Sequence, residues 1–348
     1  MKSLICAKDF RILALFGLTL TAINAARADA ISDFYNGSTV TIVVGSSPGG
    51  TYDLYGRTIA RHLGKHIPGL PTVIVQNLPG AGSYRAAQRV YSVAAQDGLT
   101  IGSLGAALPY QPIYDPKAPP LDVKRINWLG SISPFHMFML VRSDVPVHSV
   151  KDLATHETIQ ATIAPGQANS LIVAVVNEVF GARIKGIAGH KSMNDSMLAL
   201  QRGEVNGYPS MPAEALKRRY LKSLQDGDFR LILQFGPAPL PDYMNVPWAL
   251  GLAQSEDDRL LIELATGFLN TGYVYMMGPG VPKERVIAMR KAIMSALHDP
   301  ELIADAKKQT LNIAPLDGDK VAALLMRAYS MPPSVVKRMK RVFTVSSK

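Results

Sequence analysis

Residues 39–64 read TVTIVVGSSPGGTYDLYGRTIARHLG, which predicts a strand, a glycine-rich loop and a helix in succession. The run Thr39 to Val44 is mostly β-branched, and apolar residues recur at helical spacing from Thr51 to Gly64. The same alternation continues with a strand, a helix and a strand at residues 72–75, 85–94 and 100–104. The order βαβαβ is typical of a parallel sheet.

A second α/β unit is expected after the proline-rich, irregular stretch at residues 109–120. The extended segments are expected at residues 127–132, 138–141, 159–163, 183–187 and 272–277, and the helices from residue 150 and at 170–180, 193–202, 282–297, 301–308 and 320–329. The last three helices are amphipathic and are expected to pack on the first unit. About 320 mature residues exceed the size at which a single core usually stops growing, so two domains are expected.

We therefore predict an α/β fold of two lobes that form a clamshell, in which each lobe is a mostly parallel sheet flanked by helices. Lobe 1 is expected to comprise residues 31–140 plus 271–348, and lobe 2 residues 141–270. Ligands of such folds bind in the cleft at the carboxyl ends of the strands. Helix N-termini in these loops attract anions, because their backbone N–H groups have no intrahelical partner and the helix dipole adds positive charge.

Residues 1–28 have the pattern of a secretory signal peptide. Lys2, Lys8 and Arg11 precede an apolar run at residues 12–23, and small residues close the segment at 26–28. We expect cleavage after residue 28, or at residue 30, and export of the remaining chain. The apolar run is shorter than the roughly 20 residues that a membrane-spanning helix needs, so no lasting membrane anchor is expected.

The charge and the cysteine count narrow the kind of site. The single cysteine, Cys6, lies within the signal segment, so the mature chain has no thiol for a disulfide, a nucleophile or a thiolate metal site. Loss of residues 1–28 removes four positive residues and one negative residue, so the formal charge falls from +10 to +7. The positive residues are dispersed except at 217–219 and 337–341, where solvated helix faces explain them, so no nucleic-acid binding is expected. A basic surface instead helps to attract anionic solutes.

The glycine-rich loop formally matches the G-x-S-x-G motif of serine hydrolases at residues 45–49. In that motif, the residue after the nucleophile donates its backbone N–H to the oxyanion. The residue after Ser47 is Pro48, which has no N–H, so a secreted hydrolase that uses Ser47 lacks a required donor. We therefore predict a binding site without a catalytic role.

The same loop suits an anion, because the N–H groups of Gly49, Gly50 and Thr51 are expected to converge at the start of a helix. Asp53 either caps this helix or receives an ammonium or hydroxyl group of the ligand, and the sequence leaves both roles open. A second glycine-rich loop follows at residues 77–83. The chain has no nucleotide-binding motif, and its seven histidines show no metal spacing, so neither a cofactor nor a metal ion is expected.

Three motifs occur in order along the chain: VVGSSPGGTYD at residues 43–53, VQNLPGAGS at 75–83 and DGLT at 97–100. Together they resemble the Bug family, the TctC-like receptors of tripartite tricarboxylate transporters. The likeness returns at residues 278–282 and so spans nearly all of the mature chain. It implies a type II periplasmic binding protein that closes on a carboxylate. By matching positions, it also implies ligand contacts from Ser47, Gly49, Gly50, Thr51, Asp53, Asn77, Gly82 and Ser83.

The second lobe departs from this family pattern. Where family members commonly have a glycine-serine loop followed by histidine, this chain reads PGQANSLI at residues 165–172, and only Gly166 matches well. The candidates for ligand contact from this lobe are Gly166, Gln167, Asn169, Ser170, His190 and Lys191. Three tyrosines are expected on or beside the cleft loops, where they either stack on an aromatic carboxylate or pack between the lobes: Tyr52, Tyr84 and Tyr208.

These observations predict a monomeric, periplasmic solute-binding protein without catalytic activity. Its expected ligand is a small mono- or dicarboxylate, aromatic acids included, and its expected partner is the membrane permease of a tripartite tricarboxylate transporter. A ligand sensor that presents its closed form to a signalling receptor is the alternative among non-enzymes.

Overall fold

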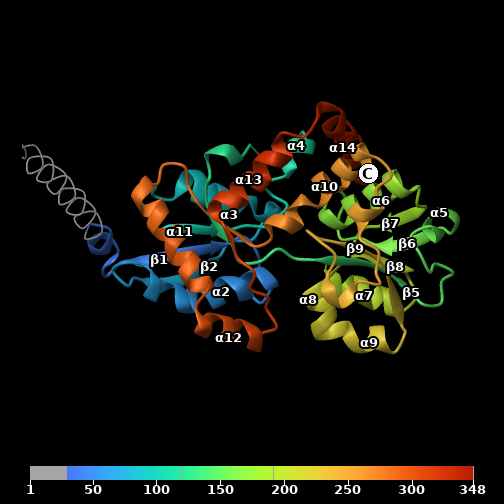
Figure 1. Cartoon of the computed structure of the whole chain (residues 1–348), viewed down its shortest axis with the longest axis horizontal. Helices are drawn as coiled ribbons and strands as arrows, with labels where there is room; N and C mark the ends of the chain where they lie inside the picture. The colour runs from blue at the N-terminus through green and yellow to red at the C-terminus, as the bar shows by residue number, and fades with distance from the viewer. Residues whose placement is uncertain (1–29, 119, 191, 348) are drawn as a thin grey trace, which may run out of the picture.

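The computed structural model describes residues 30–118, 120–190 and 192–347, which fold into two lobes, each built on one sheet flanked by helices (Figure 1). The predicted signal peptide at residues 1–28 and the candidate Lys191 lie outside the described residues. No helix in the described part of the chain is long and apolar enough to cross a membrane.

The first lobe is built on a six-stranded sheet in the order β11-β4-β10-β3-β1-β2. Its strands are β1 (Thr39–Val44), β2 (Thr72–Asn77), β3 (Thr100–Ser103), β4 (Asn127–Ser131), β10 (Val274–Met277) and β11 (Leu316–Asp317). β1 pairs in parallel with β2 and β3, which confirms the prediction from the βαβαβ order. β10 runs antiparallel to both β3 and β4, and β11 runs antiparallel to β4.

The second lobe is built on a five-stranded sheet in the order β7-β6-β8-β5-β9. Its strands are β5 (Met137–Arg142), β6 (Thr158–Ala161), β7 (Ile184–Ile187), β8 (Gly207–Pro212) and β9 (Phe229–Phe235). β6 pairs in parallel with β7 and β8, whereas β5 runs antiparallel to β8 and β9. β8 and β9 are not predicted from the sequence, and β8 reads GYPSMP, in which two prolines weaken the strand pattern.

The prediction of two α/β lobes is confirmed, but the mostly parallel strand direction predicted for each sheet is wrong, because both sheets are mixed. A parallel pair needs a crossover connection within one lobe, and the βαβ units supply such connections. β5 and β10 instead enter their sheets directly from the other lobe, and each runs antiparallel to both of its neighbours.

The helices cover the faces of the two sheets. Those of the first lobe are α2 (Thr51–Leu63), α3 (Tyr84–Gln88), α11 (Lys283–Leu297), α12 (Pro300–Lys308) and α13 (Gly318–Tyr329). Those of the second lobe are α5 (Asp152–Thr155), α6 (Ala168–Phe180), α7 (Met193–Gln201), α8 (Ala213–Ala215), α9 (Leu221–Gln225) and α10 (Glu256–Thr271). A π-helical turn, η5 (Leu216–Tyr220), joins α8 to α9. The short helix α4 (Gln111–Tyr114) lies in the stretch that the sequence predicts to be irregular.

Local side-chain caps explain where several helices begin. Ser192 accepts a hydrogen bond from the backbone N–H of Asp195 at the start of α7. Asp299 caps α12 in the same way, and so does Asp317 for α13. Such caps satisfy N–H groups that have no partner inside the helix, so they fix the first residue of each helix.

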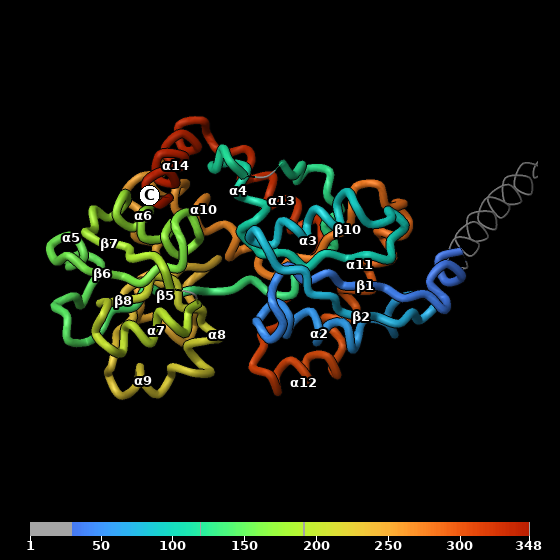
Figure 2. The backbone as a smooth tube through the Cα atoms, turned by 180° about the vertical axis from the view of Figure 1, so that it is seen from behind, coloured from blue at the N-terminus to red at the C-terminus, as the bar shows by residue number. Residues whose placement is uncertain are grey.

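The chain passes between the lobes three times (Figure 2). It crosses from β4 to β5, from α10 to β10, and from α13 to the C-terminal helix α14 (Pro333–Ser346). As expected, α11, α12 and α13 pack on the first lobe, against α2 and β4. α14 packs instead against α6 and α10 and also contacts α4, so the end of the chain touches both lobes. The expected lobe boundaries, which place residues 271–348 in lobe 1, stay a prediction.

Candidate functional site

A cleft of about 1090 Å³ lies between the two lobes, and residues of both line it. The first lobe contributes the loop residues 49–52, 81–82 and 105–108, and the second contributes residues 165–168 and 192–194. The volume lies near the upper end of the range for small-molecule sites. Loops that follow strands therefore form opposing walls, as the sequence predicts.

The loop between β1 and α2 is held by Asp53, whose side chain is buried. Its Oδ2 accepts hydrogen bonds from the backbone N–H of Gly49 at 2.8 Å and from Nε of Arg57 at 3.0 Å. Burial by itself raises the pKa of Asp53, but the hydrogen bonds from Arg57, Gly49 and Asn77 hold the pKa below its ordinary value. Asp53 therefore closes the loop before α2 without capping an N–H group of the helix itself, and the two roles left open for it stay predictions. The N–H of Gly49 is already engaged and does not join the expected anion cradle.

Asn77 and Ser83 tie the loops of the first lobe together. The Asn77 amide donates to the Ser46 carbonyl at 3.0 Å and to Asp53 Oδ1 at 2.9 Å. The Ser83 hydroxyl donates to the Gly45 carbonyl at 2.9 Å and accepts the N–H of Gly105 at 2.9 Å. The loops that follow β1, β2 and β3 therefore meet at one buried hydroxyl.

The start of α2 leaves backbone donors open toward the cleft. Among the described residues, no hydrogen bond engages the N–H groups of Gly50, Thr51 or Tyr52, and all three residues line the cleft. The Tyr52 hydroxyl accepts the N–H of Ala106 at 3.0 Å, and burial raises the pKa of Tyr52 to about 12. Two neighbouring N–H groups at a helix N-terminus, Gly50 and Thr51, suit a carboxylate.

The loop before α6 forms the facing wall. Gly166, Gln167 and Ala168 line the cleft, and Gly166 has a φ of +74°, which favours glycine. Within the described chain, the N–H of Ala168 has no hydrogen-bond partner. The Ser170 hydroxyl donates to the Ala164 carbonyl at 2.9 Å and thereby shapes the loop from behind.

The structure divides the sequence-predicted residues into two groups. Those that line the cleft are Gly49, Gly50, Thr51, Tyr52, Gly82, Gly166 and Gln167. Those that lie outside its lining are Ser47, Asp53, Asn77, Ser83, Asn169, Ser170 and His190. Of the second group, Ser47 is exposed on its loop and His190 donates its Nδ1–H to the Thr162 carbonyl at 3.1 Å. Tyr84 and Tyr208 do not line the cleft either.

Sequence reasoning missed an aromatic floor at the chain crossings. Phe135, Phe268 and Tyr273 line the cleft, and the ring centroids of Phe135 and Tyr273 lie 5.2 Å apart. The Tyr273 ring also meets the Tyr52 ring edge to face at 4.9 Å. Segments far apart in the sequence supply these rings, so no local pattern reveals them.

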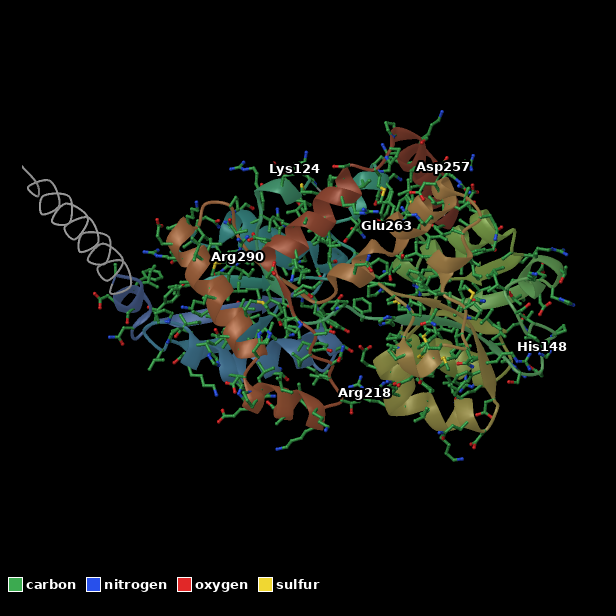
Figure 3. The ribbon with its side chains drawn as sticks, viewed as in Figure 1. Lys124, His148, Arg218, Asp257, Glu263 and Arg290 are labelled. Atoms are coloured by element: carbon green, nitrogen blue, oxygen red, sulfur yellow. The ribbon has the colours of Figure 1, made fainter. Side chains whose placement is uncertain are left out.

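Charged residues also line the cleft, and the interpretation of residues 217–219 as a solvated helix face needs correction. Arg218 and Arg219 belong to the cleft wall, together with Glu214, Asp115 and Lys117. Figure 3 shows Arg218 at the boundary between the two lobes. The segment packs Leu216 into the core of the second lobe, and only the position of the other lobe decides that Arg218 faces a cleft rather than bulk solvent.

The end of α14 completes the wall of the second lobe. Phe343, Thr344 and Ser347 line the cleft, and the Ser346 carbonyl accepts the N–H of Gly166 at 2.9 Å. The sequence gives no signal for this contact, because it joins segments about 180 residues apart.

Comparison with known proteins gives one family. The model of one protein family, TctC, matches residues 56–247 of this chain. This family is described as the tripartite tricarboxylate transporter family receptor. A Cupriavidus necator protein described as "UPF0065 protein in gbd 5'region" is 26% identical over 282 residues, which cover 79% of this chain and 80% of that protein.

Solved structures share the fold. A TctC solute-binding protein from Polaromonas superimposes with a TM-score of 0.67 at 17% identity, covering 89% of this chain and 99% of its own. The periplasmic binding protein BugD gives a TM-score of 0.63 at 19% identity over 88% of this chain and 98% of its own. The Rhodopseudomonas palustris protein Rpa4515, solved with adipate, gives a TM-score of 0.61 at 17% identity, covering 89% of this chain and 97% of its own. At these identities, the likeness shows a two-lobed binding-protein fold.

Proposed function

This chain belongs to the tripartite tricarboxylate transporter receptor family, and we propose that it captures a small organic carboxylate between its lobes in the periplasm and delivers it to a tripartite membrane transporter. The family predicted from the three sequence motifs is confirmed by the match over residues 56–247. The members of this family are solute-binding receptors, which agrees with a cleft that binds rather than transforms its ligand.

One observation carries the carboxylate proposal: the N-termini of α2 and α6 open into the same cleft from opposite lobes. Gly50 and Thr51 supply free N–H groups on one side, and Ala168 supplies one on the other. Each helix has 13 residues, so its dipole places roughly half a positive charge at its start. A carboxylate that bridges both ends would favour the closed arrangement of the lobes.

Two structural neighbours support a carboxylate. Rpa4515 was solved with adipate, and the R. palustris protein MatC, with a TM-score of 0.58 at 18% identity, was solved with bound malate. Both ligands are small dicarboxylates. We infer that the ligand of this chain also belongs to the class of small carboxylates.

A thermal-shift screen and calorimetry test the ligand class. Mono-, di- and tricarboxylates of two to eight carbons are added to the mature protein, with the corresponding amides as neutral controls. A ligand at 100 times its Kd stabilises the native state by about 2.7 kcal/mol, which is a readily measured rise in Tm. If amides or another solute class stabilise the protein while no carboxylate does, the proposal is wrong.

Two proline substitutions test the backbone donors themselves. Thr51 and Ala168 are the first residues of α2 and α6, where proline is tolerated, and the residues before them are extended, as a proline requires. Thr51→Pro and Ala168→Pro each delete one free N–H, whereas Thr51→Ala and Ala168→Ser retain it. Because a hydrogen bond to a charged group contributes about 1.5–3 kcal/mol, each proline variant is expected to weaken carboxylate binding roughly 10- to 100-fold. Equal affinities for the proline variants and their controls would show that the helix N-termini do not bind the ligand.

Delivery to a transporter needs a cellular test. Uptake of the labelled carboxylate is compared in cells that lack this receptor, cells that lack the membrane subunits, and complemented cells. Receptor function predicts that uptake is lost in both deletions. Normal uptake without the receptor, with a loss of ligand-induced gene expression, would point to a sensor instead.

A further inference from the structure

Glu214 and Arg218 are two charged residues of the cleft wall whose buried polar atoms have no partner. Glu214 lies in α8, Arg218 lies in η5, and both line the cleft. Among the described residues, Oε2 of Glu214 and Nε of Arg218 are shielded from solvent and make no hydrogen bond. No ion pair within 4.0 Å involves either side chain in that part of the chain. Both side chains are partly exposed to the cleft, and shielded polar atoms of this kind without a partner are rare in folded proteins and call for an explanation.

The neighbouring cations of the same segment are already engaged. Lys217 Nζ lies 2.6 Å from Asp242 Oδ2, and Arg219 donates to Asn194 Oδ1 at 3.0 Å. Arg218 differs from both, because it lies at the boundary between the lobes (Figure 3) and has no acceptor among the described residues. Contacts with other residues of the second lobe therefore explain the positions of Lys217 and Arg219 but not that of Arg218.

Glu214 acts electrostatically on two tyrosines, Tyr55 and Tyr273. Burial is the main cause that raises the pKa of Tyr55 and of Tyr273, and the charge of Glu214 raises the pKa of each further, so these phenols lie within electrostatic reach of the carboxyl group. Burial in turn raises the pKa of Glu214. The Tyr55 hydroxyl already donates to the Asn312 carbonyl at 3.0 Å, and the adjoining floor is formed by the rings of Phe135 and Phe268. The protein thus offers Glu214 little to bond with.

We propose that Glu214 and Arg218 select the ligand as a carboxylate that bears a hydroxyl or ammonium group. Arg218 donates from the accessible part of its guanidinium group to a ligand carboxylate oxygen, and Glu214 accepts a hydrogen bond from the donor group on the same ligand. An unsubstituted carboxylate satisfies Arg218 but leaves Glu214 buried and unpaired, which disfavours binding. This inference rests on the proposed function, because it specifies the carboxylate that the cleft receives.

Calorimetry with matched acids tests the selection. Four sets share a carbon skeleton and differ in the donor group: succinate, malate and aspartate; glutarate, 2-hydroxyglutarate and glutamate; tricarballylate and citrate; phenylacetate, mandelate and phenylglycine. Methylsuccinate controls for the bulk of the substituent. In whichever set binds, we expect a hydroxy or amino member to bind at least about tenfold more tightly than the unsubstituted acid.

Substitutions at Glu214 identify the donor group. Glu214→Met removes the acceptor and is expected to reduce the preference to less than about threefold, while the unsubstituted acid binds as well as before or better. Glu214→Gln keeps an uncharged acceptor, so it retains a preference for a hydroxyl group but loses one for an ammonium group. Glu204→Gln, which removes an exposed carboxylate outside the cleft, serves as the matched control. Arg218→Gln is expected to weaken every member of a set by a similar factor.

The possible outcomes separate this inference from the proposed function. Unsubstituted acids that bind as tightly as their substituted partners overturn the inference and leave the receptor function intact. A Glu214→Met variant that alters Tm but not the ranking of ligands assigns Glu214 to a contact between the lobes, which also overturns it. If no acid of any set binds, the carboxylate proposal fails and the inference fails with it.

Discussion

The carboxylate of Asp53 accepts the backbone N–H of Gly49 at 2.8 Å, so the loop before α2 is closed by a residue of that helix itself. Asn77 and Arg57 bond to the same carboxylate from β2 and from the next turn of α2. The bonds fix the loop before a ligand arrives, which reduces the entropy that binding must overcome. The backbone N–H of Gly49 is used to hold the loop, whereas the N–H groups of Gly50 and Thr51 remain available for a ligand.

Asp53→Ala is expected to destabilise the protein by about 3 kcal/mol, because it leaves the Gly49 N–H and the Asn77 amide without their acceptor. Urea unfolding followed by circular dichroism measures the change in the free energy of unfolding. Asp33→Ala, at an exposed position near the start of the described chain, is the control and should change it by less than about 0.5 kcal/mol. A loss for Asp53→Ala no larger than that of the control would show that the loop does not depend on this carboxylate.

The glycine at position 45 and Ser83 form a tightly packed pair that a double-mutant cycle can test. A Cβ at Gly45 would clash with the side chain of Ser83, so Gly45→Ala is expected to destabilise the protein by about 2 kcal/mol. Ser83→Gly loses the bonds to Gly45 and Gly105 but relieves the strain of a side chain at φ +79°, so its net cost is expected to be about 0–2 kcal/mol. In the double variant, the clash with the side chain is gone, so its loss should be smaller than the sum of the single losses by at least about 1 kcal/mol. Additive losses would mean that the loop moves aside instead.

The sequence predicts the site unequally in the two lobes. The first-lobe loops are local, because a strand, glycines and a helix follow one another, and Gly50 and Thr51 both line the cleft. The opposite wall brings together Phe135, Arg218 and Tyr273, which meet only because the chain crosses between the lobes. The pattern at residues 217–219 is that of any basic helix face, so nothing local reveals that Arg218 lines a cleft.

The mixed sheets have a related cause. The βαβ pattern predicts the parallel pairs of β1, but it contains no information on β5 and β10, whose direction depends on their arrival from the other lobe. Asn77 and Ser83 illustrate a further limit. Their side chains bond to neighbouring loops, and a motif match does not distinguish a residue that touches a ligand from one that holds the loop. Their roles as ligand contacts stay predictions.

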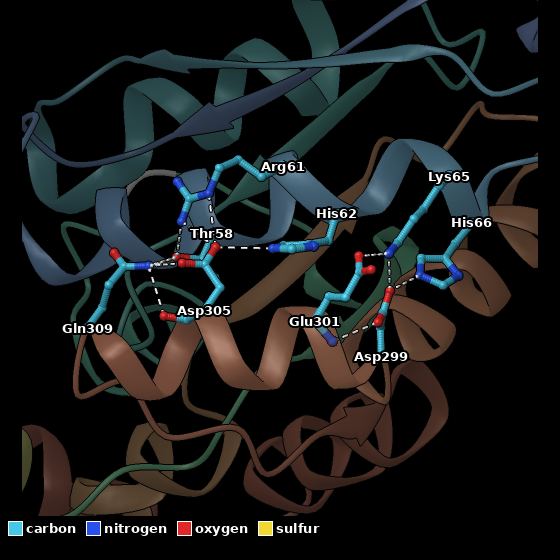
Figure 4. Close-up of polar contacts among 9 residues, drawn as sticks. All are labelled: Thr58, Arg61, His62, Lys65, His66, Asp299, Glu301, Asp305 and Gln309. Atoms are coloured by element: carbon cyan, nitrogen blue, oxygen red, sulfur yellow. Dashed lines mark hydrogen bonds and ion pairs between the residues drawn. The ribbon is translucent and has the colours of Figure 1, made fainter.

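The ion pairs between η1 (Gly64–His66), the 3-10 turn that follows α2, and the N-cap of α12 predict a loss of stability in acid (Figure 4). Asp299 lies 2.7 Å from Lys65 Nζ and 2.9 Å from His66 Nε2, and the bond from Lys65 holds the pKa of Asp299 far below its usual range. A carboxyl group whose pKa is lowered in the folded state stabilises it above its unfolded pKa of about 3.9, and this contribution is lost as the pH falls from there toward the folded pKa.

Asp299→Asn is therefore expected to lower the free energy of unfolding at pH 7, and the difference from the wild type should shrink below about pH 4. Urea unfolding between pH 7 and pH 2.5 measures both. Asp257→Asn, at an exposed position without an ion pair among the described residues, should give curves that follow the wild type. A difference for Asp299→Asn that stays constant over this range would assign the effect to the lost cap of α12 instead.

The last turn of α14 is expected to support ligand binding through the loop before α6. The Ser346 carbonyl accepts the N–H of Gly166, whose φ is +74°, and Phe343 packs beside the same glycine. A chain that ends at residue 343 loses the acceptor but keeps the aromatic contact. We expect it to bind the carboxylate identified by the screen about tenfold more weakly, because the Gly166 N–H loses its partner and the loop is less fixed.

Calorimetry measures the affinity, and a chain that ends at residue 347 is the control. The fall in Tm should be small, because the packing of α14 on α6 and α10 is largely retained. If the shorter chain binds as the control does, the end of α14 only covers the cleft and does not hold its wall.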